Sequence, residues 1–91
     1  MTDEQLVELD RQTKWESMPP VMRATDIYQE ILDQGQEAIP DLIMALRDKR
    51  APIPVMMLLT DITGQSPVKP AQRGYVDQMI EAWLDWAEDN V

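Results

Sequence analysis

The stretch from Gly35 to Asp48, GQEAIPDLIMALRD, constrains the fold more than any other part of the chain. Gly35 can adopt the positive φ that ends a preceding helix, and Pro40 suits the first turn of a following helix, where a missing N–H costs little. Beyond this turn, apolar side chains recur at the i, i+3, i+4 and i+7 spacing of an amphipathic helix, namely Ile39, Leu42, Ile43 and Leu46. The sequence therefore predicts two helices that meet at a sharp corner.

The first twenty residues predict one helix followed by a proline turn. Thr2 and Gln5 form a capping-box pattern, so a helix should run from about residue 3 to residue 14. The apolar stripe of this helix is weak, which makes residues 1–20 a candidate for a loosely docked, mobile segment. Two prolines at 19 and 20 then break the helix. We expect Trp15 and Met18 to anchor the turn in the core.

Turn-forming residues divide the rest of the chain into further helices. One helix should start at Val21 or Thr25, end at Gln34 and form an antiparallel pair with a helix over 36–49. A strongly apolar central helix is expected over 54–63, capped by Gly64, and a loop over 65–72 leads to an amphipathic helix over 73–89. No segment alternates apolar and polar residues as a strand does, so we predict an all-α bundle of four to five antiparallel helices.

Ninety-one residues fit a single domain, 1–91, with one core. The core predicted from the apolar stripes consists of Ile39, Leu42, Leu46, Leu58, Leu59, Ile62, Ile80, Trp83 and Leu84. A chain of this size buries only about 60 to 65% of the surface that its unfolded form exposes, which favours association. Because the central helix is apolar around its whole circumference, we expect Met56 or Met57 to lie at a partner surface or a homodimer interface.

Charge is distributed unevenly along a chain whose net charge is −9. Residues 1–46 carry a net charge of −7, residues 47–73 carry +3 and residues 74–91 carry −5. One interpretation is that the basic middle is neutralised inside the fold by the acidic ends. The other is that an acidic surface meets a basic partner. The net negative charge repels phosphate, so it disfavours direct binding of nucleic acid or of an anionic membrane.

The residue types that most enzymes use are missing from this chain. It has no cysteine and no histidine, which removes disulfides, thiolate metal sites and the commonest general base and metal ligand. Asp61, Thr63 and Gln65 have the spacing of a calcium loop, but Ser66 and Gln72 stand where that loop needs glycine and glutamate. We therefore expect no enzyme, no cofactor and no metal site. Without a ~20-residue apolar run or a signal peptide, we expect a cytoplasmic protein.

The strongest functional signal is a row of acidic residues on the last helix. Asp77, Glu81, Asp85 and Glu88 share the face opposite the apolar stripe, and Trp86 flanks that face. One interpretation is a solvated face beside a tryptophan that completes the core. The other is a partner-binding surface in which the carboxylates attract a basic protein and Trp86 anchors it.

Two stretches resemble known families. YQEILDQGQEAIPDLIMALRD resembles one unit of the HEAT-like repeats, whose helical pairs often carry a glycine, then Ala-Ile-Pro, then leucines at helical spacing. LLTDITGQSPVKPAQRGYVDQMIEAWLDW is similar to a group of small bacterial and phage-borne proteins with an ITG, PV, RG and AWL-W pattern. The first resemblance implies a HEAT-like helical bundle that serves as a protein-binding scaffold, and the second implies no particular reaction.

Three hypotheses follow for the function. The first is an acidic, HEAT-like protein–protein interaction module that is not catalytic and is able to self-associate. The second is an acidic inhibitor of a nucleic-acid-binding enzyme, such as a phage counter-defence protein or an antitoxin, whose carboxylates imitate a phosphate backbone. The third is a hydrolase or a metal protein. A basic partner released by moderate salt would favour the second, and a bound divalent ion would favour the third.

Overall fold

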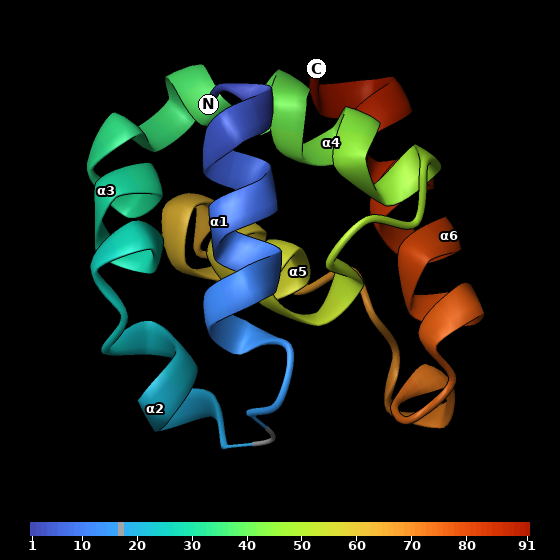
Figure 1. The fold of residues 1–91 in the computed structure, drawn as a ribbon. Helices are drawn as coiled ribbons and strands as arrows, with labels where there is room; N and C mark the ends of the chain where they lie inside the picture. The colour runs from blue at the N-terminus through green and yellow to red at the C-terminus, as the bar shows by residue number, and fades with distance from the viewer. Residues whose placement is uncertain (17) are drawn as a thin grey trace.

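The computed structural model describes residues 1–16 and 18–91, and these residues contain helices and no strand (Figure 1). Five α-helices of nine to fifteen residues make up most of the fold, with one five-residue helix and two 3-10 turns between them. In chain order they are α1 (Asp3–Thr13), α2 (Pro19–Arg23), α3 (Asp26–Gln34), η1 (Gly35–Ala38), α4 (Ile39–Arg47), α5 (Pro52–Thr63), η2 (Pro70–Gln72) and α6 (Val76–Asn90). The predicted all-α fold is confirmed.

Helix α1 begins with the predicted capping box. The Thr2 hydroxyl accepts a hydrogen bond from the Gln5 backbone N–H at 3.1 Å, and the Thr2 backbone N–H donates to the Gln5 side chain at 2.9 Å. Both contacts satisfy N–H groups that have no partner inside a helix. Leu6 and Leu9 are buried where α1 packs against α3 and α5. Helix α1 thus contributes to the core despite its weak apolar stripe.

The corner at Gly35 forms, but it separates the two helices more than the sequence predicts. Gly35 has a φ of 60°, and its N–H donates to the Leu32 carbonyl at the end of α3. The 3-10 turn η1 follows, so α4 begins at Ile39 and not at Gln36, with Pro40 in its first turn. The chain turns so far in η1 that α3 packs on α1 and α5, whereas α4 packs on α5 and α6, with little contact between α3 and α4 (Figure 1). The expected antiparallel pair is therefore not formed.

Helix α5 is the centre of the molecule, as its uniformly apolar sequence predicts. It packs against α1, α3, α4 and α6, and Val55, Leu58 and Leu59 have no exposed surface. Gly64, with a φ of 69°, ends it in the left-handed conformation. Met56 is buried and Met57 is half-buried within the one chain. A single copy thus covers most of the helix that we expected to need a partner.

Most of the predicted core is buried, and Tyr28 is a large member that the prediction missed. The buried members of the predicted set are Ile39, Leu42, Leu46, Leu58, Leu59, Ile80 and Trp83, whereas Ile62 and Leu84 are half-buried at its edge. Tyr28 lies in the core with no exposed surface.

The predicted anchor of the proline turn is wrong. Trp15 is 90% exposed and Met18 is 58% exposed. The two prolines do not simply break the chain but occupy the first turn of α2, where their fixed φ suits a helix. This short helix directs Met22 inward, and Met22 is the buried side chain of α2.

Candidate functional site

Helix α6 places all four predicted acidic residues on its solvent side. Asp77, Glu81, Asp85 and Glu88 are exposed. The opposite face of the helix is buried through Ile80, Trp83 and Ala87, where α6 packs against α4 and α5. Because residues three and four positions apart lie on one face of a helix, the four carboxylates form a single row along α6. We call this row the acidic face.

Among the described residues, the acidic face has an ion-pair partner at one end. Lys49 Nζ lies 3.2 Å from Asp77 Oδ1, and both side chains are well exposed to solvent. An exposed pair of this kind contributes less than about 1 kcal/mol to stability. Within residues 1–16 and 18–91, Glu81, Asp85 and Glu88 take part in no ion pair. Three neighbouring carboxylates are therefore available to a partner.

Trp86 lies at the boundary between the core and the surface. It packs against the core, with its ring centre 5.4 Å from that of Trp83 and the two ring planes at 76° in an edge-to-face arrangement. It is also only half-buried, and it lines a surface hollow of about 340 Å³ beside the acidic face. The other walls of this hollow come from α6 and the preceding loop, and include Pro67, Lys69, Gln72, Asp85 and Asp89.

The basic middle of the chain is partly neutralised by the acidic ends. Arg50 Nη1 lies 2.5 Å from Asp3 Oδ1, and Lys49 pairs with Asp77 as described above. The other three basic residues of this segment, Arg47, Lys69 and Arg73, form no ion pair with the part of the chain that the structure describes. The first interpretation thus holds for Lys49 and Arg50, and the second, an acidic surface that meets a basic partner, stays a prediction.

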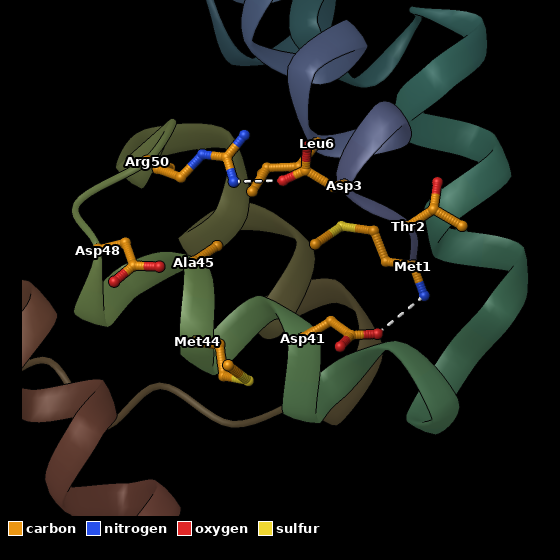
Figure 2. A pocket seen from close by; sticks show the side chains of 9 residues that line it. All are labelled: Met1, Thr2, Asp3, Leu6, Asp41, Met44, Ala45, Asp48 and Arg50. Carbon is orange, nitrogen blue, oxygen red and sulfur yellow. Dashed lines mark hydrogen bonds and ion pairs between the residues drawn. The ribbon is translucent and has the colours of Figure 1, made fainter.

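A second hollow, of about 220 Å³, lies between the start of α1 and helix α4 (Figure 2). The Met1 amino group lies 3.1 Å from Asp41 Oδ2, and the Arg50–Asp3 pair closes another side (Figure 2). Its only hydroxyl group belongs to Thr2, which already caps α1. Asp3, Asp41 and Asp48 also line the hollow, and the contact between Met1 and Asp41 ties the start of the chain to α4.

A third polar cluster joins α2, α3 and α5. Tyr28 donates its hydroxyl to Asp61 Oδ2 at 2.5 Å, and Arg23 Nε lies 2.9 Å from the same oxygen. Burial raises the pKa of Asp61, but the hydrogen bonds from Arg23 and Tyr28 outweigh it and hold that pKa below its ordinary value. Burial and the Asp61 carboxylate together raise the pKa of Tyr28. The cluster links the three helices, and the Tyr28 side chain at its centre is buried.

The carboxylates of the described chain do not gather into a metal-binding group. Among residues 1–16 and 18–91, no three acidic side chains come close enough together to hold a metal ion. In the row on α6 the carboxylates follow one another along the helix and do not converge on a point. Within the same residues, no helix has the length and apolar content needed to cross a membrane.

Comparison with protein-family models, with curated proteins and with solved structures gave no match. The resemblance to HEAT-like repeats and to small bacterial and phage-borne proteins therefore stays a prediction. The function has to be inferred from the chemistry of the surface itself, and in particular from the acidic face and Trp86.

Proposed function

We propose that this protein is a non-catalytic interaction module of the cytoplasm that binds a basic protein through the acidic face of α6. The observation that carries the proposal is the set of three exposed carboxylates, Glu81, Asp85 and Glu88, that have no ion-pair partner in the described chain and lie beside the half-buried Trp86. A HEAT-like scaffold, which the sequence resembles, would serve the same purpose.

The two kinds of side chain have different parts in this binding. Carboxylates that are free of internal partners attract a basic surface from a distance and speed the encounter. Tryptophan supplies a large apolar contact and is enriched among the residues that dominate binding energy. The hollow beside Trp86, whose wall includes Lys69 and Asp85, gives a partner side chain a defined place to insert. We expect the acidic face to set the association rate and Trp86 to set the dissociation rate.

The proposal is tested by charge reversal with a matched control. We expect E81K/D85K to lose the basic partners that the wild-type protein captures from cells, and to associate at least about tenfold more slowly with the purified partner at low salt. The control is E30K/D33K, which changes the net charge by the same amount at two exposed acids of α3 that also form no ion pair in the described chain. This control should bind almost as well as the wild type.

Two results would contradict the proposal. Equal binding by E81K/D85K and the wild type would show that the acidic face is only solvated, and would direct attention to the surface that carries Arg47, Lys49 and Arg50. An equal loss in both charge-reversed variants would show that net charge matters and the position of the acids on α6 does not. Circular dichroism of each variant establishes that the helices are intact.

A second candidate is an acidic inhibitor of a nucleic-acid-binding enzyme. The carboxylates of the acidic face are spaced by about one helical turn, or ~5 to 6 Å, which is close to the spacing of phosphates along a nucleic-acid strand. This candidate differs from the first in one respect, because a partner that binds nucleic acid would be displaced from the protein by added DNA. A partner that remains bound in excess DNA would exclude it.

A further inference from the structure

A third hollow, of about 250 Å³, is lined by residues of α2, α5, α6 and the loop that joins α5 to α6. Most of its lining is apolar, and the apolar members are Ile53, Met56, Met57, Val68, Met79 and Trp83. Methionine is unbranched and has several rotatable bonds, so three methionines can adapt to the shape of a flexible apolar group. The hollow therefore has an apolar surface that a ligand chain can contact.

Both charged side chains that line this hollow are positive, although the chain has 17 acidic and only 8 basic residues. They are Arg23 of α2 and Arg73, the residue after η2. Within residues 1–16 and 18–91, no aspartate or glutamate lines the hollow, and Thr60 and Ser66 add two hydroxyl groups. An apolar hollow with a few polar groups is the usual form of a small-molecule site. The sign of the two charges selects an anion.

The two arginines together carry about one uncompensated charge. Arg23 Nε lies 2.9 Å from Asp61 Oδ2 and Arg23 Nη2 lies 3.4 Å from Asp61 Oδ1, so a carboxylate outside the hollow already neutralises Arg23. Arg73 forms no ion pair with the part of the chain that the structure describes. A single charge matches a carboxylate better than a phosphate monoester, which carries about two charges at pH 7.

We propose that this hollow binds a medium-chain aliphatic carboxylic acid. The guanidinium of Arg73 can donate two parallel N–H groups to the carboxylate, and the aliphatic chain lies against the methionines and Trp83. The volume limits the ligand, because 250 Å³ is below the range of about 300 to 1,000 Å³ that is typical of sites for drug-sized molecules. We therefore expect a chain of about six to ten carbons. The proposal does not depend on the binding of a basic protein to α6.

The loop between α5 and α6 contributes to this hollow and to the one beside Trp86. Successive side chains of the loop line different hollows, since Ser66 and Val68 line the proposed carboxylate site, whereas Pro67 and Lys69 line the hollow beside Trp86. The two hollows thus share a wall but have different linings, and the four carboxylates of the acidic face are absent from the lining of the proposed site. An acid and a basic protein would therefore occupy separate places.

Spectra of the methionine methyl groups, recorded by ¹³C–¹H correlation at constant ionic strength, test the proposal with sodium octanoate as the probe. Octanoate should shift the signals of Met57 and Met79, which line the hollow, and leave in place the signal of Met44, which is exposed on α4. We expect a dissociation constant of about 0.1 to 1 mM for a ligand of about ten non-hydrogen atoms, so a titration to about 5 mM suffices. Hexanoate should bind about tenfold more weakly, because it buries two fewer methylene groups.

Three comparisons separate the charge from the apolar contact. Octylammonium has the same chain and the opposite charge, and should leave the Met57 and Met79 signals in place over the same range. R73Q removes the charge from the hollow and should weaken octanoate binding about three- to tenfold, whereas the control R47Q removes an exposed arginine outside the hollow and should not. V68W fills part of the hollow from the loop and should also weaken binding with both arginines intact.

Several results would overturn the proposal. They are a failure of octanoate to shift the Met57 and Met79 signals, an equal effect of octylammonium, and binding to R73Q or V68W that equals binding to the wild type. Equal weakening in R73Q and R47Q would also overturn it, because net charge and not the hollow would then govern binding. Circular dichroism of each variant verifies that the helices are intact.

Discussion

Asp61 illustrates why the partner of a single residue is hard to predict from the sequence. In the sequence it stands at the start of a failed calcium-loop pattern, whereas in the fold it accepts hydrogen bonds from Tyr28, 33 positions away, and from Arg23, 38 positions away. The core predicted from the sequence does not include Tyr28. The sequence also does not show that the Tyr28 hydroxyl meets Asp61, since that contact depends on how α3 packs against α5.

The cluster predicts a specific dependence of stability on pH. The pKa of Asp61 is lower in the folded protein than in the unfolded chain, where it is near 3.8, so its contribution is complete above that pH and is lost as the pH falls through the folded-state value. The pKa of Tyr28 is raised on folding, so its contribution is complete below about pH 10, the value for an unperturbed tyrosine, and is lost at higher pH. The free energy of unfolding should therefore fall at low pH because of Asp61 and at high pH because of Tyr28.

The acid side of this dependence is tested with the variant D61N. At pH 7 we expect D61N to be less stable than the wild type by about 1 kcal/mol, a value reduced for the partial exposure of Asp61. The difference should shrink below about pH 4, because Asp61 of the unfolded wild-type chain then binds a proton, whereas the folded protein binds it only at lower pH. Glu8, whose pKa the hydrogen bonds from Arg11 and Gln12 lower to about 2, titrates equally in both proteins. Urea unfolding from pH 7 to pH 3 measures the difference, and a constant difference would contradict this account.

At the scale of helices, the sequence predicts where a helix ends better than it predicts where a helix begins. Gly35 and Gly64 end α3 and α5 with positive φ, as expected from the lack of a side chain. The last helix was expected from Arg73 but begins at Val76, because Gly74 with a φ of 87° still belongs to the turn. A glycine in the sequence indicates that a positive φ is permitted at that position. It does not show whether the position belongs to the next helix or to the turn before it.

Helix α4 allows its buried and exposed faces to be compared directly. Leu42 has no exposed surface, and Met44, two positions along the same helix, is 58% exposed. We expect Leu42→Ala to lower the free energy of unfolding by about 2 to 5 kcal/mol, because it removes apolar contacts and leaves a cavity. Met44→Ala should change it by less than about 0.5 kcal/mol. Similar losses in the two variants, measured by urea unfolding, would contradict the assigned orientation of α4.

At the scale of the whole molecule, the three tryptophans show how much of the candidate site the sequence determines. Trp83 lies in the core, as the apolar stripe of α6 predicts, and Trp86 lies at the boundary of that stripe. The solvent-facing row of acids follows from the same periodicity. The pairing of Asp77 with Lys49 and the exposure of Trp15 do not, since both depend on how distant segments meet. Local sequence patterns predict which face of a helix is apolar and which is polar. The packing of distant segments determines which of these faces remain exposed to solvent.

The three indole N–H groups give the most direct test of binding at α6. In a ¹⁵N–¹H spectrum of the protein, each tryptophan contributes one indole signal. Addition of the purified basic partner should move the Trp86 signal most and leave the Trp15 signal in place, and E81K/D85K should abolish the shift. A Trp86 signal that stays fixed while backbone signals elsewhere move would show that the partner binds a different surface.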